Sequence, residues 1–91
     1  MTLYLKFKTN DESINSKVFQ FEGSMTVKAM LESFLKQTNS KMTLNPDDIA
    51  FQYGAVILNK QEQLNKVISS VFTAKRNTPI RVQDVNNVIG G

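Results

Sequence analysis

The residues best placed to do chemistry are the two glycines that end the sequence, Gly90 and Gly91. Glycine has no Cβ, so a main chain ending in this pair can enter a narrow channel and bring its last carbonyl group to a reacting atom. A terminal carboxylate is a poor electrophile and must be activated before its acyl group can be transferred. At a glycine frequency of about 7%, such a pair arises by chance at the last two positions in roughly 0.5% of chains. The plainer interpretation is a flexible end or a cloning remnant.

The rest of the chain offers few of the side chains that enzymes commonly use. It contains no cysteine and no histidine. Their lack removes thiol nucleophiles, disulfides, the usual proton shuttle at neutral pH and the soft metal ligands. We therefore expect a protein that is not an enzyme, with no catalytic residue, no metal site and no cofactor of its own.

The charged residues favour a solvated surface over a nucleic-acid groove. The net charge is +3, but the basic residues are spread from Lys6 to Arg81, and Lys75-Arg76 is the single adjacent basic pair. Nucleic-acid binders usually concentrate positive charge on one face. The sequence has no apolar run long enough for a signal peptide or a membrane span. We expect a cytoplasmic or nuclear protein that binds neither nucleic acid nor membrane.

Two strands are predicted before the first helix. Residues 2–9 alternate between apolar and polar side chains, as in a strand with one buried face. Turn-forming residues occupy 10–16 and alternation resumes over 17–22, so the sequence predicts an N-terminal hairpin. Apolar residues then recur at helical spacing after Thr26, a good N-cap, until the pattern fades at 38–40.

The second half of the chain predicts three further strands and one short helix. Residues 49–53 alternate up to Gly54, and 56–58 are long enough for a short fourth strand. Apolar residues spaced by three and four over 61–75 predict the short helix. A last strand covers 80–85.

This order of elements predicts an α+β fold in which a mixed sheet packs on one main helix. Residues 1–85 form a single domain. Residues 86–91 form a flexible tail, because they offer too little apolar surface to offset the entropy of ordering. The residues expected in the core are Leu3, Leu5, Phe7, Phe19, Phe21, Val27, Leu31, Phe34, Ile49, Phe51, Leu64 and Ile80.

The same order is that of the β-grasp, and the chain resembles ubiquitin and its relatives along nearly its whole length. The likeness lies in positions more than in identities. Residues 1–7 resemble the opening strand of the family, and 26–29 resemble the start of its helix. Residues 45–48, Asn-Pro-Asp-Asp, resemble the turn after that helix, and Gly54 resembles the turn glycine of the third strand. Gly90-Gly91 resembles the end of the mature family members.

The resemblance implies a protein modifier. In this family an activating enzyme uses ATP to convert the last glycine to an acyl-adenylate, and the acyl group passes to a carrier thiol and then to a lysine amine of a target protein. The implied partners are an activating enzyme, a conjugating enzyme, a ligase, a processing protease and the targets, and we expect the protein itself to be a monomer. Conjugation would use Gly90 and Gly91, and the partners would read the tail at Asn87, Val88 and Ile89.

Departures from ubiquitin predict a dedicated set of enzymes. The arginine that lies four residues before the last glycine of ubiquitin is replaced by Asn87, so selection by the ubiquitin activating enzyme should fail. The lysine after the turn glycine is replaced by Ala55, which puts that chain linkage in doubt. Lys75 lies near another chain-forming lysine of ubiquitin, and Lys60 is a second candidate acceptor.

The outer face of the sheet is expected to be small and polar, so the receptors that bind the apolar patch of ubiquitin should bind it poorly. An aromatic contact could come from Tyr53 or Tyr4 instead. The residues expected on this face are Ala50, Gln52, Arg81 and Gln83.

Two other functions fit the sequence. The sulfur carriers of the β-grasp share the adenylated Gly-Gly end, and Val88-Ile89-Gly90-Gly91 fits them about as well as it fits a modifier. The other alternative is an interaction domain whose terminus does no chemistry.

Overall fold

The first strand changes its partner part-way along its length. In the computed structural model, which describes residues 1–72 and 78–84, β1 (Thr2–Leu5) pairs antiparallel with β3 (Phe19–Glu22). β2 (Phe7–Lys8) pairs in parallel with β6 (Ile80–Asp84). Between them, the Lys6 carbonyl accepts a hydrogen bond from the Ile80 backbone N–H at 2.9 Å. The predicted hairpin is confirmed, with its first strand divided at Lys6.

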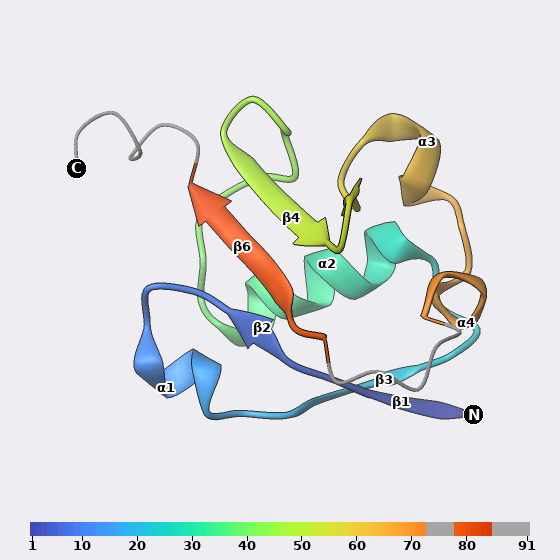
Figure 1. Cartoon of the computed structure of the whole chain (residues 1–91), viewed down its shortest axis with the longest axis horizontal. Coiled ribbons are helices and arrows are strands. Elements are labelled where there is room, and N and C mark those ends of the chain that lie inside the picture. The colour runs from blue at the N-terminus through green and yellow to red at the C-terminus, as the bar shows by residue number, and fades with distance from the viewer. Residues whose placement is uncertain (73–77, 85–91) are drawn as a thin grey trace.

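The remaining strands complete a mixed sheet. β4 (Ile49–Tyr53) pairs antiparallel with both β6 and β5 (Val56–Ile57), which gives the order β2-β6-β4-β5. Gly54 turns the chain between β4 and β5 with a φ of 61°, a left-handed conformation that glycine adopts readily. The strands predicted in the second half of the chain are confirmed within the described residues (Figure 1).

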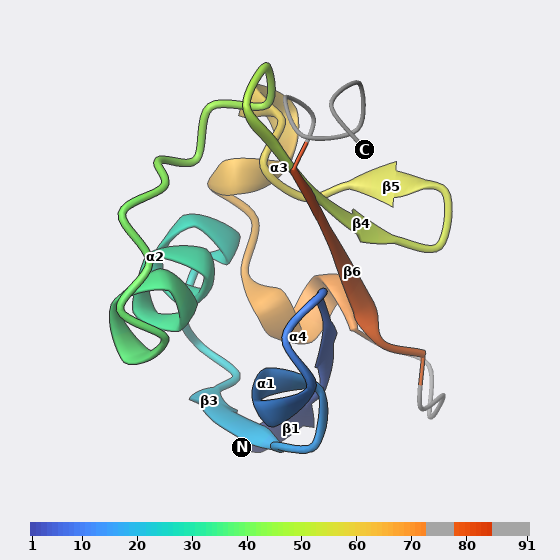
Figure 2. The same cartoon turned by 90° about the vertical axis from the view of Figure 1, so that its left-hand side faces the viewer.

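The main helix begins and ends where the sequence predicts. α2 (Val27–Gln37) starts after Thr26, whose hydroxyl accepts a hydrogen bond from the Ala29 N–H at 3.1 Å. At its other end Asn39 has a φ of 55°, a left-handed conformation that asparagine tolerates better than most residues. Figure 2 shows α2 on one side of the sheet strands, so the fold is α+β with a helix packed on a mixed sheet.

The segment between β2 and β3 contains a helical turn that the sequence analysis missed. α1 (Glu12–Asn15) is capped by Asp11, whose carboxylate accepts from the Ser13 N–H at 2.9 Å and the Ser13 hydroxyl at 2.6 Å. The Asn15 side chain holds the turn against Thr9, accepting from its N–H at 2.6 Å and donating to its carbonyl at 2.9 Å. These local side-chain bonds make a helical turn from residues that otherwise favour a loop.

The single short helix predicted over 61–75 is wrong. Two one-turn helices stand there instead, α3 (Gln61–Leu64) and α4 (Ile68–Val71), with extended backbone at Val67 between them. Val67 forms a β-bridge with Thr26. The Lys66 carbonyl accepts from the Val27 N–H at 2.8 Å, which satisfies a first-turn donor of α2. Tertiary hydrogen bonds to the start of α2 therefore override the helical spacing of the apolar residues.

The core lies between α2 and the sheet, and most of its predicted members are buried. Leu3, Leu5 and Leu64 are the exceptions, since they are only partly buried against it. Five phenylalanines form its centre: Phe7, Phe19, Phe21, Phe34 and Phe51. The buried residues that the sequence analysis omitted from the core are Met30, Leu35, Leu58, Ile68, Phe72 and the polar Asn59.

Replacing Thr26 with alanine should lower the free energy of unfolding by about 1 kcal/mol, because the variant loses the N-cap hydrogen bond of α2. Thr26→Ser keeps a capping hydroxyl and should lose much less. Urea unfolding followed by far-UV circular dichroism measures both. Equal losses in the two variants would show that the hydroxyl makes no contribution.

Candidate functional site

The residues predicted to carry the chemistry fall outside the described part of the chain, with one exception. The predictions for them therefore stay predictions, as does that of the flexible tail over 86–91. The exception is Lys60, the candidate acceptor. The residues outside the described ranges are Lys75, Asn87, Val88, Ile89, Gly90 and Gly91.

The strand that leads to these residues is held on both sides. β6 lies between β2 and β4, and the last register pair joins Asp84 to Ile49. The Gly-Gly pair follows Asp84 within the seven residues 85–91. A fully extended chain covers about 3.3–3.6 Å per residue, so Gly91 can lie at most roughly 25 Å from the end of β6. The sheet therefore fixes the position of Asp84, the residue from which the chain continues to the two glycines.

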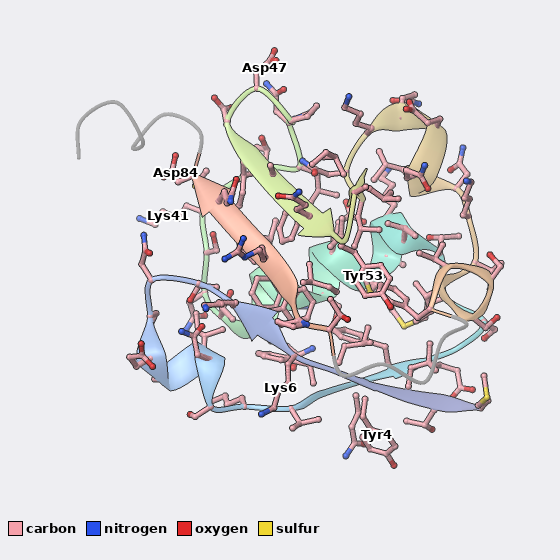
Figure 3. The ribbon with its side chains drawn as sticks, viewed as in Figure 1. Tyr4, Lys6, Lys41, Asp47, Tyr53 and Asp84 are labelled. Atoms are coloured by element: carbon pink, nitrogen blue, oxygen red, sulfur yellow. The ribbon has the colours of Figure 1, made fainter. Side chains whose placement is uncertain are left out.

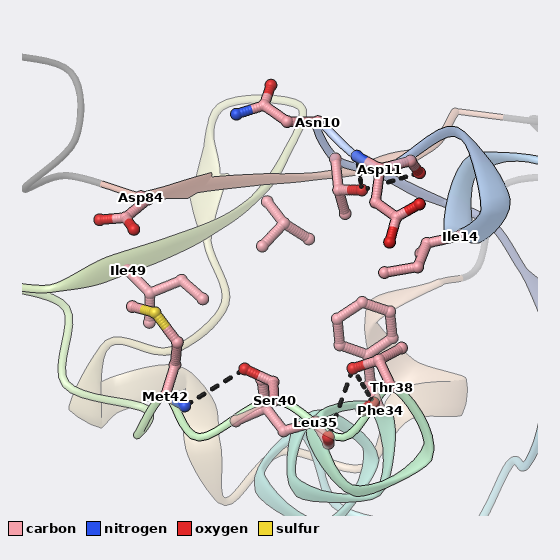
Figure 4. A pocket seen from close by; sticks show the side chains of 12 residues that line it. Asn10, Asp11, Ile14, Phe34, Leu35, Thr38, Ser40, Met42, Ile49 and Asp84 are labelled. Carbon is pink, nitrogen blue, oxygen red and sulfur yellow. Dashed lines mark hydrogen bonds between the residues drawn. The ribbon is translucent and has the colours of Figure 1, made fainter. Parts of the chain in front are cut away.

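A cavity of about 340 Å³ opens beside the end of β6 (Figure 4). Its floor is apolar and includes Phe34, Ile49 and Val82. Asp84 and Asp11 lie on opposite sides of its mouth (Figure 4). This volume is at the lower end of the range for small-ligand sites, and the lining suits an apolar side chain that carries a polar or cationic end.

Asp11 keeps its negative charge at the edge of this cavity. Hydrogen bonds from the Ser13 hydroxyl and the Ser13 backbone N–H lower the pKa of its carboxyl group, and the positive charge of Lys17 acts in the same direction. A lowered pKa favours the ionised form. The carboxylate therefore holds the start of α1 and also contributes negative charge to the rim of the cavity.

Lys60 is positioned as an accessible amine. It precedes α3 as its N-cap residue, and its side chain is exposed. Its side chain makes no hydrogen bond or ion pair with the described residues. Attack on a thioester needs an amine that a partner can reach, and the exposed position of Lys60 meets that requirement.

The outer face of the sheet carries the small and polar residues expected there. Arg81 and Gln83 are exposed, as expected, while Ala50 and Gln52 are partly exposed. Tyr4 is 65% exposed. Tyr53 instead packs against Phe72, with ring centroids 4.6 Å apart, so its ring is engaged with the core.

The structure also brings basic residues together on this outer face. The parallel register places Lys8 of β2 directly beside Arg81 of β6. Lys6 precedes them on the first strand and is also exposed. The sequence analysis treated the basic residues as spread out. The sequence analysis did not predict which strands are neighbours. A prediction that the first and last strands pair in parallel would have brought their outward basic residues together.

Within residues 1–72 and 78–84, no three acidic residues group where they could hold a metal ion. None of the helices in those ranges is long and apolar enough to cross a membrane.

Comparisons with known proteins give no relative. No family model, no curated protein and no solved structure matches the chain. The function must therefore be argued from the chain itself.

Proposed function

We propose that the protein is a ubiquitin-like β-grasp modifier, joined to lysine amines of other proteins through the carboxyl group of Gly91. The proposal implies work in the cytosol or nucleus with an activating enzyme, a conjugating enzyme and target proteins. If the natural chain continues beyond Gly91, a protease would first expose that carboxyl group.

The observation that supports it most is the pairing of the first strand. β1 pairs antiparallel with β3, and β2, its continuation, pairs in parallel with β6. The resulting order is β3, then β1 with β2, then β6, β4 and β5, with α2 packed across the sheet. A β-grasp has a hairpin, a helix and a last strand that returns beside the first. This arrangement agrees with that description.

The position of the glycines supports the chemical part of the proposal. They follow the central strand β6 within seven residues. A partner can therefore bind the folded domain while the last carbonyl group enters its active site. The carboxylate would attack the α-phosphate of ATP, releasing pyrophosphate and forming an acyl-adenylate. A partner thiol would displace AMP to form a thioester, and a lysine amine would displace the thiol to form an isopeptide bond. All catalytic groups would belong to the partners.

Two features make a dedicated activating enzyme part of the proposal. Asn87 stands where ubiquitin has the arginine that its activating enzyme reads. The outer sheet face carries Lys8, Arg81 and Gln83 in place of an apolar patch, so it offers a different docking surface. Enzymes that discriminate by charge should therefore separate this chain from ubiquitin.

The proposal is tested by removing the last residue. N-terminally tagged protein is incubated with Mg-ATP and a lysate of its native cells, and adducts are separated without reducing agent. Wild type should form an adduct that dithiothreitol cleaves, because its thiol attacks the thioester carbonyl and displaces the partner's thiol. The variant lacking Gly91 should form none, while its circular dichroism spectrum stays that of the wild type.

Lys60→Arg is the matched control. It removes a candidate acceptor amine but keeps the charge, so the thioester should form at the wild-type level. Equal adducts from wild type and the Gly91 deletion would overturn the modifier and favour an interaction domain. A C-terminal thiocarboxylate on protein from native cells, detected by mass spectrometry without isopeptide adducts, would favour the sulfur carrier.

A further inference from the structure

We propose that the outer face of the sheet binds an acidic peptide segment of a partner protein, with Lys8 and Arg81 as its central contacts. We call the exposed cations Lys6, Lys8 and Arg81 the basic face. This inference does not depend on any reaction of Gly91.

The sheet register fixes the position of the two central cations. Phe7 and Ile80 are register partners, and each is 1% exposed, so both point into the core. Successive side chains of a strand point to opposite faces, so Lys8 and Arg81, which are the next register partners, point outward together. Tyr4 lies in β1, and Lys6 lies between β1 and β2 (Figure 3).

A hollow gives these two cations a binding surface. It has a volume of about 340 Å³ and lies between the first strand and the β4–β5 turn. Gly54 leaves the turn side of the hollow without a side chain. The Gln52 side chain also lines the hollow and donates to the Gly54 carbonyl at 3.1 Å. The lining residues are Lys8, Gln52, Gly54, Thr78, Pro79 and Arg81.

The charges of the basic face are not neutralised within the described part of the chain. Among residues 1–72 and 78–84, the basic face makes no ion pair, since the single salt bridge there joins the Met1 amino group to Glu22. Among the described residues, no carboxylate lines the hollow. Like charges placed directly opposite each other on neighbouring strands are unfavourable. An anionic partner would relieve this repulsion as well as add its own attraction.

The size of the basic face favours a peptide over a nucleic acid. Nucleic-acid binders follow the backbone with a longer stripe of positive charge and often stack bases on aromatic rings. Here the cations occupy only two neighbouring strands, which is shorter than such a stripe. One extended segment can place one carboxylate near Lys8 and another near Arg81, and the Gln52 and Thr78 side chains, which also line the hollow, can hydrogen-bond to it.

The test measures binding of a fluorescein-labelled peptide that alternates glutamate with serine, by fluorescence anisotropy at low and at physiological salt. We expect binding by the wild type that weakens as salt is added. The double variant Lys8→Glu, Arg81→Glu should bind about tenfold more weakly or worse, because two attractive contacts become repulsive. Native circular dichroism of the variant confirms its fold.

The matched control is the double variant Lys41→Glu, Lys66→Glu. It changes the net charge by the same amount at two exposed lysines that do not line the hollow, and it should keep most of the wild-type affinity. An equal loss in this control would mean that bulk charge alone attracts the peptide, and it would overturn the proposal. So would a lack of binding at low salt. If a labelled oligothymidine binds more tightly than the peptide, and the Lys8→Glu, Arg81→Glu variant loses this binding, the ligand of the basic face is single-stranded nucleic acid and the proposal is wrong.

Discussion

Replacing Phe34 with alanine is expected to lower the free energy of unfolding by about 3–5 kcal/mol. Phe34 lies on α2 and is 2% exposed. Its ring contacts the rings of three other phenylalanines. It stacks on Phe7 with centroids 3.9 Å apart, and contacts Phe19 edge to face at 5.2 Å and Phe51 at 6.0 Å. The variant loses both the buried apolar area and these ring contacts, and the rigid strands on the other side cannot close the cavity.

A domain of this size has roughly 5–15 kcal/mol of stability, so Phe34→Ala should unfold at a much lower urea concentration than the wild type. Tyr4→Ala is the matched control, because it also truncates an aromatic ring but at a side chain that is 65% exposed. It should change the midpoint little. A loss below about 1 kcal/mol in Phe34→Ala would contradict the packing described for the core. If that variant does not fold, Phe34→Leu should show a smaller, measurable loss in the same direction.

Elements whose local signals agree could be predicted from the sequence. α2 has a capping threonine and helical spacing of apolar residues that fades at 38–40, and the structure places the helix as these signals predict. β4 has alternation and a turn glycine, and its predicted range is confirmed. In both elements the local preference and the packing require the same conformation.

Elements decided by distant contacts could not be predicted in this way. The spacing of Val67 and Ile68 suits a continuous helix, but the backbone at Val67 is extended because Val67 forms a β-bridge with Thr26, just before α2. The pairing of Lys8 with Arg81 joins residues more than seventy positions apart, and no local pattern contains it. The buried Asn59 is similar, since an asparagine after a short strand normally indicates an exposed turn.

The same distinction applies to the candidate site. Gly90 and Gly91 could be proposed from residue type and position alone, because the chemistry they permit depends on the lack of a side chain. The cavity beside Asp84 and the basic face depend on which strands are neighbours. The sequence alone could indicate which residues of each strand point outward or inward. It could not show which of these residues lie next to one another in the sheet.

Asn59 is the buried polar residue that joins three parts of the chain, and its side chain is 1% exposed. Its Oδ1 accepts from the Phe51 N–H at 3.0 Å. Its Nδ2 donates to the Ile49 carbonyl at 2.7 Å and to the Leu44 carbonyl at 3.0 Å. It therefore fixes β4 and the loop that precedes it to the chain after β5.

Replacing Asn59 with leucine should lower the free energy of unfolding by about 3 kcal/mol or more. Leucine fills a similar volume, so the loss comes from polar groups rather than from a cavity. The variant removes the partner of the Phe51 N–H and of the Ile49 carbonyl, and each buried group left without a partner costs about 1–3 kcal/mol. Urea unfolding measures the loss, and a value below about 1 kcal/mol would show that water or a shifted backbone replaces these bonds.

Asn59→Asp separates the donor role of this side chain from its shape. An aspartate keeps the acceptor for Phe51 but places a carboxylate oxygen against the Ile49 and Leu44 carbonyl groups, so it should be strongly destabilising at pH 7. Protonation restores one donor, and the folded state therefore binds a proton more tightly than the unfolded state does. The loss of stability relative to wild type should then shrink as the pH falls from 7 to about 4. A loss that stays constant over this range, measured by urea unfolding of both proteins at each pH, would show that the amide donates no important hydrogen bond.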